Sequence, residues 1–392
     1  MKTKHKMMVL VLMGVWLAVI FLFQGCVPKV RPSESVLDTP EHHVQSGMKL
    51  LKQGKYDTAM REFEFAKELD PEFSGAYVGS GLVFGYRGDF KQGIEDIKKA
   101  VDLAKTKGEK VDANVGLIRL YSLGKKSAHK KWLKKAKGAY EDAIDLQPGS
   151  SAAHYYMGEA YKGALNFEKA SQLFKKVLDI NKTYVVEAND AWKLIQEIQR
   201  AAPGTMIGKK IALVDQITRA DIAALFIQEL KIDDLFEKRT KKEFDTKFKS
   251  PEKEFVTGRL VKTSAALDIG DHVLRTDIEA VMEHGIKGIE PYPDHTFKPD
   301  QKIARAEYAI MIEDILIKAT GDEKLATKFI GGPSPFPDLR SDLPYYNAVM
   351  VCTTRGIMET KDLASGEFDP MGSVSGADAL LIIRKLQTAI KR

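Results

Sequence analysis

Residues 285–307 read GIKGIEPYPDHTFKPDQKIARAE, and residues 356–378 read GIMETKDLASGEFDPMGSVSGAD. The second stretch repeats the first at a fixed offset of 71 residues, and no gap is needed to align them. Both copies keep a glycine at the start and a Phe-x-Pro turn (Phe297 and Phe368). Both also keep a β-branched residue (Ile303 and Val374) three positions before an alanine, and an acid directly follows that alanine. A repeat that keeps these positions repeats a supersecondary unit, so the C-terminal half contains copies of one small element.

The first of these stretches is similar to a known motif. Residues 292–300 (YPDHTFKPD), followed by residues 303–307 (IARAE), resemble the S-layer homology (SLH) motif, whose members attach proteins to cell-wall polymers. Residues 217–221 (ITRAD) form a third such element, although no Phe-x-Pro turn precedes it. Because the SLH fold is a pseudo-threefold helical bundle, the resemblance implies an SLH-like domain over residues 203–392. It would contain three copies, the first truncated, and a charged insertion at about residues 237–262.

Two arginines are the candidate polymer-binding residues. Arg305 and Arg219 occupy the position at which the arginine of the SLH family lines the grooves between copies and contacts the wall glycan, whereas the third copy has Gly376 there. A guanidinium can form two parallel hydrogen bonds to a carboxylate, which a lysine cannot do. The alternative is an arginine that pairs with a neighbouring acid inside the bundle. The acids of the same elements match helix capping boxes and are interpreted as structural.

The N-terminus resembles a bacterial lipoprotein signal. Residues 1–25 combine a basic start, an apolar run over residues 7–23 and a small residue before Cys26. This pattern is typical of an export signal, and the resemblance implies that Cys26 becomes the lipidated first residue. Val27 stands where an Asp would favour inner-membrane retention, so we expect a lipid anchor in the outer membrane that faces the periplasm. The alternative is an uncleaved membrane anchor, because about 17 apolar residues are just enough to span a bilayer.

A 34-residue period begins at Pro40, after an expected extended tether over residues 26–39. The first copy has small, aromatic and proline residues at offsets characteristic of the tetratricopeptide repeat (TPR): Gly47, Gly54, Tyr56, Ala59, Phe63, Ala66 and Pro71. Three more copies follow, and the third needs about eight extra residues in its inter-helix turn. We therefore expect a mainly α fold. Four TPR repeats plus a closing helix would form a helical-hairpin solenoid over residues 40–202, and the SLH-like bundle would follow it.

Residues 124–138 (GKKSAHKKWLKKAKG) form a possible anionic-partner patch. The stretch contains no acid and seven lysines: Lys125, Lys126, Lys130, Lys131, Lys134, Lys135 and Lys137. One interpretation is a positively charged surface for lipid headgroups, an acidic protein segment or a polysaccharide. The other is a solvated loop and helix start, since lysine is common on exposed faces.

The composition excludes several classes of function. The net charge of +6 includes the lysines of the signal, so the mature protein is only mildly basic and no nucleic-acid partner is indicated. The only cysteine besides Cys26 is Cys352, which lies in an apolar stretch and is interpreted as a buried small residue. No catalytic motif or metal-ligand spacing occurs, so we expect no enzyme activity, no cofactor and no metal.

These features favour a non-enzymatic envelope lipoprotein. It would tether a protein partner through the TPR surface to peptidoglycan or a wall-linked polymer through the SLH module. The alternative is an assembly or scaffold factor for a pilus, a secretion system or an exopolysaccharide export machine, in which the SLH module is only structural. A glycan-active enzyme would need paired carboxylates in a cleft, which the sequence alone does not identify.

Overall fold

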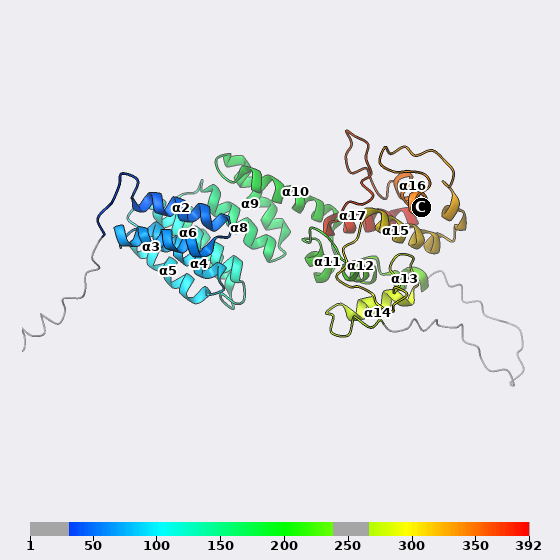
Figure 1. Cartoon of the computed structure of the whole chain (residues 1–392), viewed down its shortest axis with the longest axis horizontal. Coiled ribbons are helices and arrows are strands. Elements are labelled where there is room, and N and C mark those ends of the chain that lie inside the picture. Colours follow the sequence, from blue (N-terminus) through cyan, green and yellow to red (C-terminus); the bar gives the residue numbers. More distant parts are fainter. Residues whose placement is uncertain (1–30, 238–265, 392) are drawn as a thin grey trace, which may run out of the picture. The chain divides into compact units, whose positions relative to one another are not determined.

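The computed structural model describes residues 31–237 and 266–391, which fold into two compact units. The chain divides between Asn189 and Asp190 into an N-terminal and a C-terminal unit (Figure 1). Extended backbone pairing in the described residues is limited to two isolated bridges, Thr218 with Lys302 and Ala304 with Ser373. The predicted mainly α fold class is confirmed.

The boundary between the units differs from the predicted one after residue 202. It lies within α10 (Val185–Ala201). The end of this helix belongs to the C-terminal unit because Arg384 donates from Nε to the Ala201 carbonyl at 2.8 Å and from Nη2 to the Ala202 carbonyl at 2.6 Å. A helix is present where the closing helix was predicted, but its residues from Asp190 onward belong to the C-terminal unit.

The N-terminal unit contains four helical hairpins. They are α2 (Pro40–Lys52) with α3 (Tyr56–Leu69), α4 (Ser74–Tyr86) with α5 (Phe90–Leu103), α6 (Lys107–Gly124) with α7 (Trp132–Leu146), and α8 (Ser151–Gly163) with α9 (Phe167–Ile180). The third hairpin holds the extra residues, which are divided between a longer first helix and a longer turn. α6 has 18 residues where α2, α4 and α8 have 13. The predicted helical-hairpin solenoid is confirmed.

Glycines allow successive hairpins to pack closely. Phe63 is fully buried, and a Cβ atom added to Gly47 or Gly79 would lie 2.6 Å or 2.1 Å from its ring. The fourth hairpin repeats the contact that Phe63 makes within its own hairpin, since a Cβ on Gly158 of α8 would lie 2.7 Å from the Phe174 ring on α9. Such distances are too short for a side chain, so the aromatic ring takes the space that each glycine leaves.

The described part of the predicted tether is not extended. Residues 31–39 form a turn that returns to α3, where the Arg31 amide donates to the Glu68 carbonyl at 2.8 Å. The Arg31 side chain also pairs with Asp38 at 2.8 Å. These local hydrogen bonds and the ion pair hold the segment against the first hairpin, which a count of prolines does not predict.

The C-terminal unit has more irregular helices. They are α11 (Met206–Ile211), α12 (Arg219–Leu225), the π-helix η1 (Phe226–Leu230), α13 (Ile232–Glu237), α14 (Arg275–Glu283), α15 (Arg305–Thr320), the 3₁₀-helix η2 (Glu323–Thr327), α16 (Tyr346–Thr354) and α17 (Gly376–Lys391). The predicted charged insertion lies outside the described residues beyond Glu237.

Three copies of the repeated element lie around residues 217–221 (copy one), 285–307 (copy two) and 356–378 (copy three), and backbone hydrogen bonds join them in a cycle. Copy one meets copy two where the Ile303 amide donates to the Ile217 carbonyl at 3.2 Å, and copy three where the Ile217 amide donates to the Val374 carbonyl at 3.0 Å. Copy two meets copy three where the Arg305 amide donates to the Gly372 carbonyl at 2.9 Å. The equivalent helices α12, α15 and α17 follow these contacts, so the predicted pseudo-threefold bundle is confirmed.

Candidate functional site

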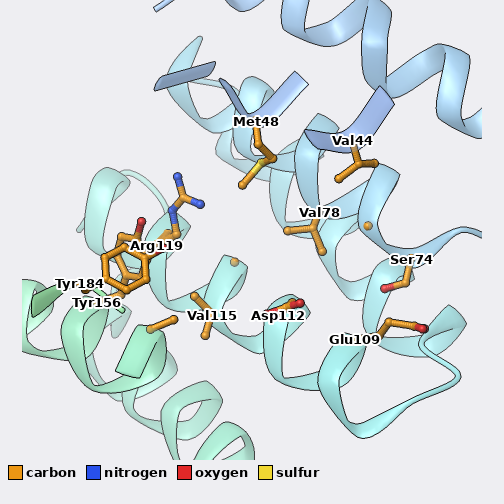
Figure 2. A pocket seen from close by; sticks show the side chains of 13 residues that line it. Val44, Met48, Ser74, Val78, Glu109, Asp112, Val115, Arg119, Tyr156 and Tyr184 are labelled. Atoms are coloured by element: carbon orange, nitrogen blue, oxygen red, sulfur yellow. The ribbon is translucent and has the colours of Figure 1, made fainter. Parts of the chain in front are cut away.

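The first candidate site is a groove in the N-terminal unit. The first helices of all four hairpins and Tyr184 line a pocket of about 280 Å³ (Figure 2). Its walls are largely apolar, with Val44 and Met48 on α2, Val78 on α4 and Val115 on α6. A pocket to which every repeat contributes is suited to an elongated ligand rather than a compact one.

Three charged residues of α6, Glu109, Asp112 and Arg119, line this groove. Asp112 and Arg119 both line the pocket, with Val115 and Gly116 between them in the sequence. Residues three, four and seven positions apart share one helix face, and this explains why these four residues lie on the same side of α6. The pair of Asp112 and Arg119 was not predicted from the sequence. The signal was present, because Gly116 holds a repeat position and the charged residues flank it at helical spacing.

Asp112 has an unusual environment. The side chain reaches solvent, and it makes no hydrogen bond or ion pair within residues 31–237 and 266–391. The concave wall nevertheless displaces much of the water around it, and this partial burial raises the pKa of Asp112 above its ordinary value. The negative charge of Glu109 raises it further, whereas the Glu109 carboxylate itself accepts a hydrogen bond from the Lys105 amide at 2.7 Å.

Arg119 lies with a group of tyrosines at the other end of the pocket (Figure 2). Its guanidinium carbon is 4.8 Å from the centre of the Tyr156 ring. Tyr155 and Tyr184 stack with ring centres 4.9 Å apart, and Tyr156 meets Tyr184 edge-on. In the described part of the chain no carboxylate pairs with Arg119. The groove thus presents an anionic end and a cationic end.

The lysines of the possible anionic-partner patch are exposed, and this exposure fits both a binding surface and a solvated loop. All seven lysines over residues 125–137 reach solvent. Lys131, Lys134 and Lys135 line a hollow of about 650 Å³, and Asp142 lines the same hollow. Lys137 pairs with Glu141 at 3.0 Å. Binding of an anionic partner here stays a prediction.

In the C-terminal unit, the two candidate arginines are buried. Arg219 is 3% exposed, and its three nitrogens donate to the carbonyls of Phe297, Gly288 and Glu290 at 2.7, 2.8 and 2.7 Å. Arg305 is 5% exposed. It donates to the carbonyls of Phe368 and Glu359 at 2.8 and 2.7 Å. These two acceptors lie 71 residues after Phe297 and Gly288, two of the acceptors of Arg219.

Each guanidinium therefore joins its own copy to the turn of the next copy. Arg219 lies 4.8 Å from the centre of the Phe297 ring, and Arg305 lies 4.7 Å from that of Phe368. Burial lowers the pKa of both arginines, and the carbonyl acceptors compensate for the lost water. The predicted alternative, pairing with a neighbouring acid, is not what the geometry provides. A ligand that contacted either guanidinium directly would have to displace these main-chain partners.

The third joint of the cycle has neither an arginine nor a turn. A Cβ atom added to Gly376 would lie 1.7 Å from the Ile211 carbonyl oxygen, so no side chain fits there. The Gly376 amide instead donates to the Val214 carbonyl at 2.8 Å. Copy one lacks the Phe-x-Pro turn that a third arginine would hold, and residues 211–214 occupy the position. Gly376 in copy three and the missing Phe-x-Pro turn in copy one, both visible in the sequence, therefore belong to one altered joint.

Two acids that hold the turns were not predicted from the sequence. Both oxygens of Asp268 accept main-chain amides, from Phe297 at 2.7 Å and Lys298 at 2.8 Å. Asp338 does the same for Phe368 at 3.0 Å and Asp369 at 2.7 Å. The two acids are separated by 70 residues rather than 71, so an ungapped comparison of the copies does not align them.

A second pocket opens where the three copies meet. It has a volume of about 540 Å³ and combines polar residues, among them Lys302, Glu307 and Tyr345, with the apolar Ile310 and Met371. Lys302 donates from Nζ to the Gln216 carbonyl at 2.8 Å, and Glu307 accepts from the Ala304 amide at 2.8 Å. This pocket, rather than the arginines themselves, is the accessible part of the junction.

Other predictions concern single residues or whole segments. Cys352 is fully buried, so its interpretation as a buried small residue is confirmed. Across the described ranges, no group of three or more His, Cys, Asp or Glu residues could hold a metal ion. None of the helices described is long and apolar enough to cross a membrane. The predicted signal and Cys26 lie outside the described residues.

Comparison with known proteins identifies both repeat types. Residues 335–380 match the model of the S-layer homology domain. A stretch of 135 residues is 30% identical to tetratricopeptide repeat protein 6 of Homo sapiens, covering 34% of this chain and 24% of the relative. The chain carries tetratricopeptide repeats and an S-layer homology domain. The match to this relative spans about a quarter of the relative's length. An S-layer homology domain indicates association with the cell envelope or surface.

Solved TPR structures are similar to the solenoid. A thermophilic TPR protein of Thermus thermophilus is 21% identical, with 51% of this chain and 96% of that chain covered at a TM-score of 0.34. MamA of Desulfovibrio magneticus RS-1 is 17% identical, with 41% and 96% covered at a TM-score of 0.27. PilF of Pseudomonas aeruginosa is also 17% identical, with 43% and 93% covered at a TM-score of 0.21. TPR and SLH modules are binding modules rather than catalytic ones.

Proposed function

We propose that this protein is a non-enzymatic tether of the cell envelope. Its TPR groove holds a protein client, and its SLH domain holds peptidoglycan or a wall-linked polymer. The observation that carries the proposal is the presence of two binding modules in one chain, each with a pocket that has polar side chains in its lining.

The polymer site that we propose is the pocket between the SLH copies. Lys302 supplies a cation, Tyr345 supplies an aromatic face and a hydroxyl, and Met371 is 66% exposed. Sugars with acidic substituents match a mixture of cationic, hydroxyl and apolar groups. Arg305 and Arg219 act in this proposal as positioning residues, because they hold the turns that form the walls rather than contacting the polymer.

We further propose that Cys26 anchors the protein by lipid in the outer membrane, facing the periplasm. The sequence pattern around Cys26 is the support for this step. Intact mass of the protein extracted from membranes tests it, because cleavage before Cys26 with added acyl chains and an uncleaved N-terminus give different masses. An uncleaved mass would contradict the lipid anchor and leave the two binding modules unaffected.

Co-sedimentation with purified sacculi tests the polymer site. The full chain, purified in detergent, is expected to sediment with sacculi, and Lys302→Gln and Tyr345→Ala are each expected to reduce the bound fraction several-fold. Lys324→Gln is the matched control, because Lys324 is an exposed lysine of the same domain outside the pocket. Full-chain protein that stays in the supernatant at low salt would contradict the proposal. Binding that both pocket variants retain would place the polymer elsewhere.

The alternative function is an assembly or scaffold factor in which the SLH domain is only structural. The internal use of both arginines favours it, since they are the residues for which the family resemblance implies polymer contact. One dominant protein partner found by crosslinking, together with an absence of sacculus binding, would support this alternative over the tether.

A further inference from the structure

We propose that the TPR groove selects an extended client segment that carries a basic side chain and a carboxylate about three residues apart, with the basic side chain at Asp112 and the carboxylate at Arg119. This inference rests on the proposed function, in which the groove holds a protein client, and it specifies the chemistry of that client.

The anionic end of the groove is available to a ligand. Asp112 lines the pocket, and its carboxylate has no hydrogen-bond or ion-pair partner in the described residues. Glu109, one turn earlier on α6, adds negative charge beside it while its own carboxylate accepts the Lys105 amide. An unpaired carboxylate in a partly water-depleted groove is stabilised by a cation that enters it.

The cationic end is equally available. Arg119 lies against the Tyr156 ring, which orients the guanidinium but leaves it without a carboxylate in the described structure. A guanidinium held on an aromatic face is pre-organised for a planar acid, so little side-chain freedom is lost when a carboxylate binds. An Asp or Glu side chain of the client, or its chain terminus, supplies this carboxylate.

The distance between the two ends sets the spacing in the client. Asp112 and Arg119 are seven residues apart on one helix, which places their α-carbons roughly 10.5 Å apart along the axis at 1.5 Å per residue. An extended peptide advances about 3.3 Å per residue, so three residues cover this distance. Between the two ends, the pocket surface is formed by Val78, Val115 and the bare backbone of Gly116. Small apolar side chains in the client therefore fit between its two charges.

A protein segment is the occupant that the geometry favours. The lining comes from α2, α4, α6 and α8 and continues to Tyr184, so the groove crosses all four repeats rather than enclosing one small molecule. Figure 2 shows Arg119 beside Tyr156 and Tyr184, Asp112 apart from this group toward Glu109, and Val115 between Asp112 and Arg119.

A displayed library of random ten-residue peptides tests the inference. The full chain, purified in detergent and immobilised, is expected to select peptides with Lys or Arg at one position and Asp, Glu or the chain terminus about three positions away. Asp112→Asn is expected to abolish the preference for the basic residue and keep that for the acid. Arg119→Gln is expected to do the reverse. Each variant should weaken binding of a selected peptide about five- to tenfold, as measured by fluorescence anisotropy.

Two matched variants serve as controls. Asp102→Asn and Arg61→Gln remove the same charges from exposed positions on the second helices α5 and α3, outside the pocket. They should leave both preferences unchanged, and thermal unfolding of all four variants should match the original protein.

The outcomes separate this inference from the proposed function. Peptides that bind without a charge preference, or whose preference survives Asp112→Asn and Arg119→Gln, would overturn the inference and leave a TPR client possible. A library from which nothing binds overturns the inference, and if crosslinking in cells also finds no protein partner, the client function fails with it.

Discussion

Both units of this protein are built from repeats, but the repeats are joined in different ways. In the TPR unit the joint is an apolar ring against bare backbone, as where Phe63 fills the space beside Gly47 and Gly79. In the SLH unit the joint is a buried guanidinium that reaches main-chain carbonyls of the following copy, 54 to 78 residues further along the chain. The first kind of joint needs only a side chain that fits against bare backbone. The second also needs carbonyl oxygens that accept the hydrogen bonds of the guanidinium.

This difference explains the third SLH joint. A buried guanidinium costs several kcal/mol unless its donors find acceptors. Copy one has no Phe-x-Pro turn to provide the carbonyls, so an arginine at residue 376 would be buried without partners. Gly376 against the Ile211 carbonyl replaces a polar joint by close backbone packing. The TPR unit has no such constraint: in its second repeat Ile97 takes the place of Phe63, and a Cβ on Gly81 would lie 2.5 Å from the Ile97 side chain.

The largest expected effect is on the apolar joint. Phe63→Ala should destabilise the TPR unit by about 3–5 kcal/mol, because it removes a fully buried ring between two glycines and leaves a cavity. Hydrogen exchange measured by mass spectrometry should show faster exchange in α2, α3 and α4. Phe65→Ala is the control on the same helix, since Phe65 is 40% exposed. An effect of Phe63→Ala below about 1 kcal/mol would mean that this joint is not closely packed.

The guanidinium joints should show the next largest effect. Arg305→Met keeps the side-chain stem but removes two charge-assisted hydrogen bonds, and it should destabilise the SLH unit by about 2–4 kcal/mol. Arg219→Met removes three such bonds and should cost more than Arg305→Met. A methionine leaves the carbonyl acceptors buried and unpaired, which an apolar replacement cannot compensate. Urea unfolding of both variants provides the measurement.

Full stability in both methionine variants would contradict a structural role for the arginines. It would return them to the direct polymer contact that the family resemblance implies. Arg61→Met is the control, because Arg61 is exposed in the TPR unit.

The same comparison explains what the sequence could and could not predict. The TPR joints consist of glycines and aromatic rings at fixed offsets, so periodicity identified both the residues and their role. The position of Arg219 and Arg305 was equally visible, but their partners are backbone carbonyls with no residue signature. Asp268 and Asp338 were missed because a one-residue shift removed them from the 71-residue offset. Asp112 and Arg119 were missed because the repeat pattern specifies small, aromatic and proline positions and leaves the groove-facing residue types open, although their spacing from Gly116 was visible.

The altered third joint should respond to a single methyl group. Gly376→Ala should destabilise the SLH unit by about 1–3 kcal/mol, because the new Cβ would lie 1.7 Å from the Ile211 carbonyl oxygen and the backbone would have to move. Gly270→Ala is the matched control, since nothing lies within 4 Å of a Cβ at that position. It should be neutral or slightly stabilising. Equal effects in the two variants would mean that the joint around Gly376 adapts freely.

The smallest expected effect concerns a carboxyl group packed against a neighbouring helix. Glu313 on α15 accepts a hydrogen bond from Asn347 on α16, and burial raises its pKa from 4.5 to about 7 despite that bond and despite Lys287. The charge of Asp314 adds to the increase. Since the folded protein holds this proton more tightly than the unfolded chain, stability is greatest below about pH 4.5 as far as this group is concerned. It then falls as the pH rises to about 7.

Because Glu313 is partly exposed, solvent screening limits the loss to roughly 1–2 kcal/mol. Glu313→Gln keeps an acceptor for Asn347 and cannot ionise, so it should abolish this part of the pH dependence and stabilise the SLH unit at pH 8 but not at pH 4.5. Glu323→Gln, at an exposed position of η2, should leave the profile unchanged. Urea unfolding at half-unit pH steps gives the comparison. A Glu313→Gln profile parallel to that of the original protein would show that the carboxyl is solvated, and that α15 and α16 pack less tightly than the arginine joints beside them.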